Sequence, residues 1–202
     1  MHPLIYRTFE EICQAEKAAG PVLEVGSVPG PDSLLRMKCL SRISGKTGIN
    51  LDPPVTDEEI RIVQGNANEM TCFGDALFET VLCNATLEHD AFFWKTTAEI
   101  RRVTRPGGLV VIGVPGYSGM GIEESYPTGT FLRRVLRLLK RATRDDGLMA
   151  GTLTLGEHFY PGDYYRFSAQ AIREVLLEGL VKVTVRKVMN PPRIIGWGRK
   201  SA

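Results

Sequence analysis

The sequence lacks a strong excess of charge of either sign. Its 202 residues include 25 Lys and Arg against 23 Asp and Glu, which gives a formal net charge of +2. Dedicated nucleic-acid-binding proteins usually carry a marked basic excess, so this balance argues against nucleic acid as a partner. Internal repeats and low-complexity segments are also absent from the sequence.

Long hydrophobic runs are missing as well. No apolar stretch approaches the roughly 20 residues that a membrane-spanning helix needs. The first residues, MHPLIYRTFEEICQ, lack the apolar region of a signal peptide. We therefore expect a soluble protein.

Cysteine is scarce, and its spacing excludes the common zinc sites. The four cysteines, Cys13, Cys39, Cys72 and Cys83, form no CxxC pair, and no Cys/His cluster has zinc-ligand spacing. The sequence also has no compact set of Asp, Glu and His, so we expect no metal. Free thiols suit a reducing compartment, which predicts a cytoplasmic location.

What the sequence does contain is an alternation of strand-like and helix-like segments. Hydrophobic residues make up 43% of the chain, enough for the core of a single domain over residues 1–202. Periodicity predicts strands at 22–25, 47–51, 61–64, 76–83 and 109–114, helices at 4–19, 91–103 and 168–179, a short helix after Pro31-Asp32, and a late hairpin of 181–188 and 194–197. Such alternation is typical of βαβ units around a mainly parallel sheet.

The pattern breaks after Pro115. Residues 116–165 are rich in Gly, Tyr and Pro, and we expect an inserted lid or substrate region there. Within it, Phe131–Arg144 has the pattern of a basic amphipathic helix. The common explanation is a solvated basic face over a core stripe. The alternatives are a lid, a surface for an acidic substrate, or weak contact with a membrane surface.

The first predicted strand runs into a glycine-bearing turn, Val22–Gly30. Glycine lets the backbone turn sharply and lets a ligand approach closely. Glu24 stands just before the first glycine, where a carboxylate is awkward for a pyrophosphate but suits a ligand with an ammonium group. The same carboxylate could instead brace the loop, and many strand-to-helix turns carry two glycines without binding anything.

Four segments, together with a fifth, resemble a known family. They are VLEVGSVPG (22–30), GINLDPP (48–54), VQGNANEM through LEHD (63–90), EIRRVTRPGGLVVIGVPGY (99–117) and PGDYYRFS (161–168). Their order and spacing resemble the class I, Rossmann-like S-adenosylmethionine-dependent methyltransferases, and more narrowly the bacterial methyltransferase-domain proteins with LEH and DYYRF segments. The resemblance implies a three-layer α/β fold with a seven-stranded, mostly parallel sheet and a C-terminal antiparallel hairpin.

The resemblance also implies a cofactor site for S-adenosylmethionine, with S-adenosylhomocysteine as product and no metal. Its residues divide by the part of the cofactor they would meet: Glu24, Gly26, Ser27 and Gly30 for the methionine part, Asn50 or Asp52 for the ribose, Asn66, Ala67 and Asn68 for the adenine, and Asn84, Ala85 and Leu87 for the wall beyond. Asp52 before Pro-Pro could also only initiate a turn, and Asn66 is a common turn residue.

Three positions depart from the family pattern. Val28 stands where a middle glycine is frequent, and Asn50 and Asn66 stand where aspartate is common. These departures keep open a non-catalytic, cofactor-binding or regulatory protein with a degenerate site.

The candidates for chemistry are fewer, because the cofactor itself supplies the reactive methyl group. His89 and His158 are the candidate bases, since a histidine titrates near working pH. Tyr117, Tyr164 and Arg166 are the candidate substrate-binding residues. His89 could equally be structural, and the DYYRF stretch could lock the insertion to the sheet.

The sequence thus predicts methyl transfer to a small-molecule or glycan/lipid-precursor acceptor, with oxygen favoured over nitrogen or carbon. A nicotinamide-dependent oxidoreductase on a similar fold is the other alternative. Glu24 before the glycine turn and the late hairpin argue against it.

Overall fold

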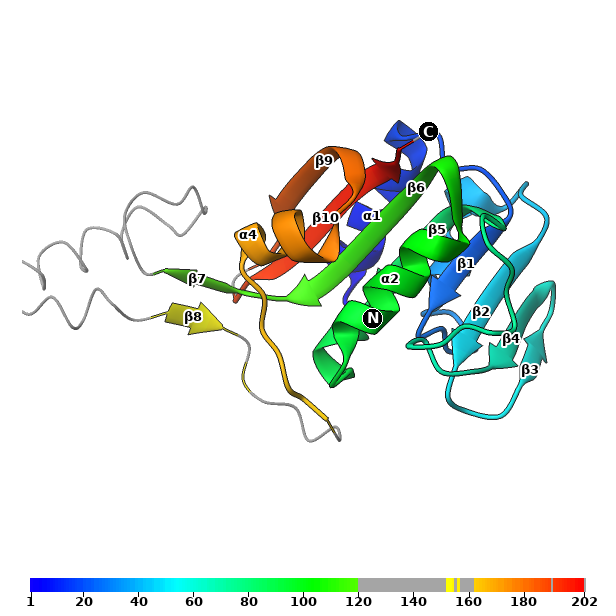
Figure 1. Ribbon diagram of the computed structural model, residues 1–202, viewed down its shortest axis with the longest axis horizontal. Coiled ribbons are helices and arrows are strands. Elements are labelled where there is room, and N and C mark those ends of the chain that lie inside the picture. The colour runs from blue at the N-terminus through cyan, green and yellow to red at the C-terminus, as the bar shows by residue number, and fades with distance from the viewer. Residues whose placement is uncertain (120–151, 155, 157–161, 190, 202) are drawn as a thin grey trace, which may run out of the picture.

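The computed structural model describes residues 1–119, 152–154, 156, 162–189 and 191–201. An eight-stranded mixed sheet forms its centre, in the order β3-β4-β2-β1-β5-β6-β10-β9 (Figure 1). In chain order the strands are β1 (Val22–Val25), β2 (Lys46–Asn50), β3 (Val55–Asp57), β4 (Ile60–Gln64), β5 (Phe78–Asn84), β6 (Thr104–Pro115), β9 (Leu180–Lys187) and β10 (Arg193–Lys200).

The five inner strands, from β4 to β6, pair in parallel, while β3, β10 and β9 join antiparallel. The mostly parallel sheet and its C-terminal antiparallel hairpin are confirmed. The expected number of seven strands is wrong within this sheet, because β3 adds an antiparallel edge beside β4. Its three residues are polar or exposed, so they give no hydrophobic alternation for the sequence to reveal.

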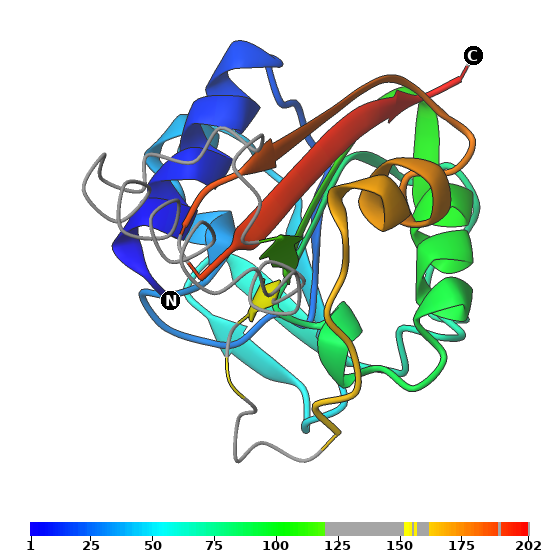
Figure 2. The ribbon, with the colours of Figure 1, turned by 90° about the vertical axis from the view of Figure 1, so that its left-hand side faces the viewer.

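Helices cover both faces of the sheet, which gives three layers (Figure 2). Helix α1 (Pro3–Ala15) and the 3-10 helices η1 (Leu34–Arg36) and η2 (Lys38–Leu40) pack on one face. Helix α2 (Phe93–Val103), the turn α4 (Ala169–Ala171) and the π-helical turn η5 (Ile172–Leu176) pack on the other. Two separate hydrophobic clusters fill the two interfaces.

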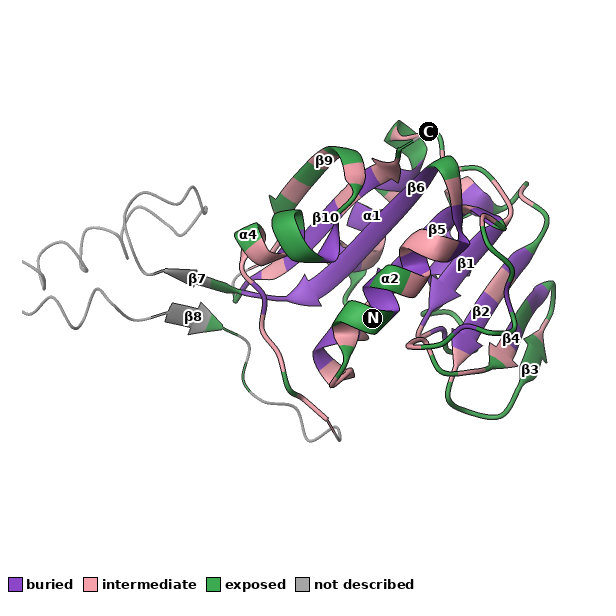
Figure 3. Ribbon diagram, viewed as in Figure 1, coloured by how far each residue is buried: buried purple, intermediate pink, exposed green. Residues whose placement is uncertain are grey.

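The alternation of side chains along the strands explains why both faces are apolar. In β1 every residue is buried: Leu23 and Val25 belong to one cluster and Val22 to the other. A strand covered on both sides needs such a run rather than a polar face, as expected for a parallel sheet between helices. Figure 3 shows β1, β5 and β6 as the buried centre of the molecule.

The helix expected at 168–179 is shorter in the structure. Ser168 is its N-cap, because its Oγ accepts a hydrogen bond of 2.9 Å from the Ala171 amide. One helical turn follows, and the helix then continues as the π-helical turn η5 and ends at Leu176. Gly179, at φ +75°, turns the chain into β9.

Part of the expected insertion forms a two-stranded ribbon. Strand β7 (Tyr117–Gly119) pairs antiparallel with β8 (Thr152–Thr154), and the pair lies beyond the end of β6 (Figure 1). The predicted basic helix 131–144 and His158 lie outside the described residues. Among the helices of the described ranges, none combines the length and apolarity needed to span a membrane.

We expect Gly113→Ala in β6 to destabilise the protein by about 1–3 kcal/mol. A Cβ there would stand 2.6 Å from Asn84 Oδ1 and 2.8 Å from Phe9 Cε2, so helix α1 would have to move off the sheet. Urea unfolding measures the change. Gly74→Ala is the matched control, because its Cβ would meet nothing within 4 Å. Equal stability of the two variants would contradict the close packing of α1 on β6.

Candidate cofactor and acceptor site

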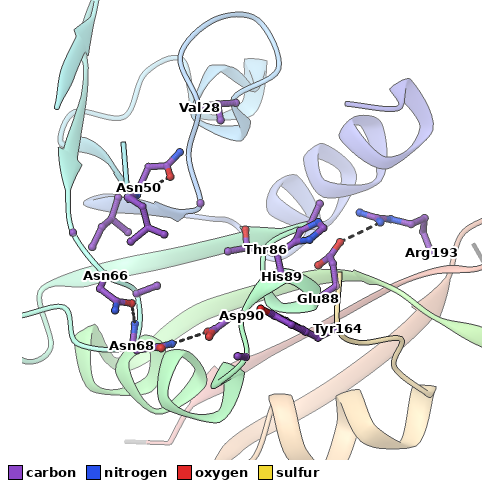
Figure 4. Close-up of a pocket in the computed structure, with 17 residues that line it drawn as sticks. Val28, Asn50, Asn66, Asn68, Thr86, Glu88, His89, Asp90, Tyr164 and Arg193 are labelled. Atoms are coloured by element: carbon purple, nitrogen blue, oxygen red, sulfur yellow. Dashed lines mark hydrogen bonds and ion pairs between the residues drawn. The ribbon is translucent and has the colours of Figure 1, made fainter. Parts of the chain in front are cut away.

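A cavity of about 630 Å³ opens where the parallel strands β1, β2, β4 and β5 end (Figure 4). Open α/β sheets bind ligands at the carboxyl ends of their strands, so this is the expected place for a site. Eight of the predicted site residues line it: Gly26, Asn50, Asn66, Ala67, Asn68, Ala85, His89 and Tyr164. These residues come from four strand ends and from the segment that follows the insertion.

A smaller cavity of about 410 Å³ adjoins the first. The predicted residues Glu24 and Asn84 line it, together with residues of α1 such as Ile5. Gly26, Val28, Ala85 and Arg193 line both cavities. The two spaces therefore meet at the glycine turn and at the start of β10.

The glycine turn is shaped by one close approach. Gly26 has φ +75°, and a Cβ on it would stand 2.1 Å from Thr86 Oγ1. The amides of Gly26 and Ser27 both donate to the Ile49 carbonyl, at 2.9 and 3.2 Å. Only glycine fits this conformation and this contact, so the turn leaves backbone exposed to the cavity.

Glu24 holds the loop that follows the turn. Its Oε2 accepts hydrogen bonds from Ser33 Oγ (2.6 Å) and Ser27 Oγ (2.9 Å), and its Oε1 accepts one from the Leu34 amide (3.0 Å). Burial raises the pKa of this carboxyl group, while the hydrogen bonds act to lower it. These hydrogen bonds hold the loop after β1 in place. Bracing this loop is the second of the two roles that the sequence allowed for Glu24.

The loop is held at its outer end by β3. The Gly30 amide donates to Asp57 Oδ2 at 2.7 Å, and Arg36 forms an ion pair of 2.8 Å with Asp57. The Arg36 guanidinium, and then the Gly30 amide, keep the pKa of Asp57 below its usual value. The edge strand missed from the sequence therefore fixes the loop that borders the site.

At the end of β2 the structure separates the two ribose candidates. Asn50 lines the large cavity, where its Nδ2 donates to the Ser27 carbonyl (2.8 Å) and its Oδ1 accepts from the Leu51 amide (2.7 Å). Asp52 is exposed and lines neither cavity. The strand ends at Asn50, so strand alternation no longer directs Asp52 toward the same side.

The two asparagines after β4 have different partners. Asn66 Oδ1 accepts from the Asn68 amide at 2.9 Å, the contact of a local turn. Asn68 Nδ2 donates to Asp90 Oδ2 (2.7 Å) and Thr96 Oγ1 (2.8 Å), and Thr96 donates to the same Asp90 oxygen (2.6 Å). This network ties the end of β4 to the 3-10 helix η3 (Leu87–His89) and to α2, and it fixes that wall of the cavity.

The end of β5 contributes backbone rather than long side chains. Ala85 has φ +54°, an uncommon value for a residue other than glycine, and lines both cavities. Its amide donates to the Gly113 carbonyl at 2.9 Å. Such conformations persist where surrounding contacts impose them, and they cluster at binding sites.

Several predicted residues lie away from both cavities. Ser27 and Leu87 are buried in the fold, Gly30 lies in the braced loop, and Tyr117 is exposed on β7. Arg166, a candidate substrate-binding residue, also lines neither cavity. Its guanidinium donates to both Asp163 oxygens at 2.6 Å and to the Gly156 carbonyl at 3.0 Å, so the DYYRF stretch locks this segment in place.

The structure adds a pair that sequence reasoning missed. Glu88 is fully buried, and its Oε1 lies 3.4 Å from Arg193 Nη1. Burial raises the pKa of Glu88 and lowers that of Arg193. The only sequence signal was the position of Glu88 in the LEHD segment beside His89, whereas Arg193 has no motif of its own.

Within the described ranges, no group of three His, Cys, Asp or Glu side chains is arranged to hold a metal ion.

We expect Glu24→Ala to lower the free energy of unfolding by about 1–3 kcal/mol, because the Leu34 amide and two serine hydroxyls lose their partner. Urea unfolding followed by circular dichroism measures this. Glu69→Ala, at an exposed glutamate, is the control and should leave stability unchanged. A Glu24→Ala protein as stable as the control would contradict the loop brace.

The comparisons with known proteins agree with this geometry. Residues 37–112 match the model of a methyltransferase domain. A comparison with curated proteins finds no match. Solved structures are similar at low sequence identity, which shows the fold.

Three of these structures illustrate the likeness. A possible exported protein from Bordetella parapertussis has a TM-score of 0.64 at 14% identity, with 98% of this chain and 67% of that chain covered. The 1,6-didemethyltoxoflavin-N1-methyltransferase of Burkholderia thailandensis, with bound S-adenosylhomocysteine, has 0.59 at 19%, with 98% and 78% covered. The N-methyltransferase NodS of Bradyrhizobium japonicum has 0.59 at 13%, with 100% and 98% covered. The chain therefore contains a segment that matches a methyltransferase domain, and its fold is that of the class I, Rossmann-like methyltransferases.

Proposed function

We propose that this protein transfers the methyl group of S-adenosylmethionine to a small-molecule acceptor, using the two adjoining cavities at the strand ends. The observation that carries the proposal is the Gly26 turn. A Cβ at Gly26 would collide with Thr86, so the backbone there stays bare beside a cavity of about 630 Å³. That volume is in the range of small-molecule and cofactor sites.

The lining residues fit the parts of such a cofactor. We assign the methionine part to the Gly26 turn, the ribose to Asn50 and the adenine to Asn66 through Asn68. Amide groups both donate and accept hydrogen bonds, as the adenine edge and the ribose hydroxyls require. When bound, the cofactor supplies an activated methyl group. The protein's own residues then have to orient an acceptor and take up its proton.

The atom of the acceptor that receives the methyl group is also part of this proposal. A hydroxyl oxygen is our first candidate, on a small molecule or on a glycan or lipid precursor, and nitrogen is the second. Both carry a proton that must leave, and His89 and Glu88 line the cavity as groups able to accept one. Nitrogen is kept as the second candidate because two structures of similar fold are N-methyltransferases, from Burkholderia thailandensis and Bradyrhizobium japonicum.

The non-catalytic alternative has less support from the geometry. Val28, which replaces a frequent glycine, is 45% exposed and lies at the junction of the cavities. Its side chain is therefore partly in solvent, and both cavities are present with valine at this position. A protein that binds the cofactor but transfers no methyl group to any acceptor class would match this alternative.

Two further assignments remain predictions. A cytoplasmic location is based on the four cysteines, all of them free thiols. Weak contact of the basic segment 131–144 with a membrane surface is likewise a prediction, tested by vesicle sedimentation of a charge-reversed variant.

Calorimetric titration with S-adenosylhomocysteine tests the proposed function. The wild-type protein should bind it saturably, and Gly26→Ala should weaken binding at least about tenfold, because the new Cβ displaces the turn from Thr86. Asn50→Ala should also weaken binding, since it frees the Ser27 carbonyl.

Asp52→Ala is the matched control, at an exposed residue two positions from Asn50, and it should bind like the wild type. Failure of a folded wild-type sample to bind S-adenosylhomocysteine would refute the proposed function. Weaker binding by Asp52→Ala alone would move the ribose assignment to that residue.

A further inference from the structure

The carboxyl group of Glu88 is buried and only half satisfied. The residue is 0% exposed, and its Oε1 approaches Arg193 Nη1 at 3.4 Å. Its Oε2 is also buried and has no hydrogen-bond partner among the residues that the structure describes. Nearly all buried polar atoms in proteins are hydrogen-bonded, so an unpaired carboxylate oxygen needs an explanation.

Glu88 is held in place by segments distant in the sequence. Its carbonyl accepts hydrogen bonds from the amides of Tyr164 (2.8 Å) and Tyr165 (3.2 Å), and its carboxyl group faces Arg193 at the start of β10. With its main chain and one of its two oxygens both held, the side chain has little freedom to turn away. Its unpaired oxygen is therefore a fixed feature of the cavity wall.

The position of Glu88 separates it from the residues assigned to the ribose and adenine. In Figure 4, Asn50 and Asn66 lie on one side of Thr86, while Glu88, Tyr164 and Arg193 lie on the other. Glu88 lines the large cavity, and its partner Arg193 lines both cavities. The carboxyl group thus lies near the junction where an acceptor in the smaller space would meet the larger one.

We propose that Glu88 Oε2 binds the proton-bearing nucleophile of the acceptor, a neutral alcohol or amine, and receives its proton during methyl transfer. This inference rests on the proposed function. Arg193 is a positioning residue: it neutralises the carboxylate and holds Oε1, which leaves Oε2 for the acceptor. An O–H or N–H donor would supply the hydrogen bond that the buried oxygen lacks.

The step balances in atoms and charge. A lone pair of the acceptor oxygen or nitrogen forms a bond to the methyl carbon, and the bond from that carbon to the sulfonium sulfur breaks with both electrons going to sulfur. The acceptor's proton passes to Glu88 Oε2, which becomes a neutral carboxylic acid and later releases the proton to water. The raised pKa of the buried Glu88 makes its carboxylate a better proton acceptor.

Three probes of similar size test the inference in the protein saturated with S-adenosylhomocysteine. Phenol and aniline carry an O–H or N–H on an aromatic ring, and toluene carries neither. Saturation-transfer NMR should give dissociation constants about tenfold lower for phenol and aniline than for toluene. In Glu88→Gln this preference should fall to about threefold or less, because a neutral amide oxygen accepts a hydrogen bond more weakly than a carboxylate. The affinity for S-adenosylhomocysteine, measured by calorimetry, should stay within about twofold.

Glu79→Gln is the matched control. Glu79 is also a glutamate paired with an arginine, Arg105 at 3.1 Å, but it lines neither cavity. It should keep the preference of the wild type. If Glu88→Gln fails to fold because Arg193 loses its partner, the double variant Glu88→Gln with Arg193→Gln replaces it, with the same expected loss.

Two outcomes would overturn the inference while the proposed function stands: a wild type without preference among the probes, or a tenfold preference that is undiminished in Glu88→Gln. A tenfold loss of S-adenosylhomocysteine affinity in Glu88→Gln would also overturn it, because Glu88 would then bind the cofactor's ammonium group. Failure of the wild type to bind S-adenosylhomocysteine would overturn the proposed function, and this inference with it, at the first titration.

Discussion

The buried carboxylate of Glu24 is the interaction on which the site depends. Its two oxygens accept three hydrogen bonds from the loop that follows β1, and those bonds replace the water that burial removes. Because this loop is braced from within, the turn at Gly26 keeps its φ of +75° and its contact with Thr86. The hydrogen bonds of the Glu24 carboxylate thus help to keep the Gly26 backbone exposed to the cavity.

The remaining walls are fixed by contacts between strand ends that are distant in the sequence. Asp57 of the edge strand holds the Gly30 amide, and Asn68 reaches across to Asp90 and Thr96. The first contact joins the loop after β1 to the edge strand β3, and the second joins the segment after β4 to the segment after β5 and to helix α2. A parallel sheet brings such segments to one edge, so a few polar side chains suffice to build a rigid cavity from loops.

The sequence predicts the parts of this fold that depend on local hydrophobic pattern. The strand at 22–25 agrees residue by residue with β1, because its mostly apolar run of four buried residues is what a parallel strand between two layers of helices requires. Strand β3 has no such run, so only its pairing with β4 reveals it. In the same way, the alternation of a strand predicts that Asn50 and Asp52 point to the same side. The structure shows that the strand ends at Asn50, so Asp52 does not follow that alternation. The Glu88–Arg193 pair joins residues 105 positions apart, a distance that no local pattern reports.

The two buried glutamates of this site, Glu24 and Glu88, differ in how completely their carboxyl oxygens are hydrogen-bonded. The burial penalty acts on both, and it raises the pKa of each. Glu24 meets that penalty with hydrogen bonds to both oxygens from its own loop, so it is satisfied by the folded chain. Glu88 has an ion-pair contact at one oxygen and no hydrogen-bond partner at the other within the described residues. A buried charge that the chain itself satisfies is structural, whereas one left half satisfied beside a cavity gains its missing bond when a ligand arrives. That difference assigns the first carboxylate to the architecture of the site and the second to its chemistry.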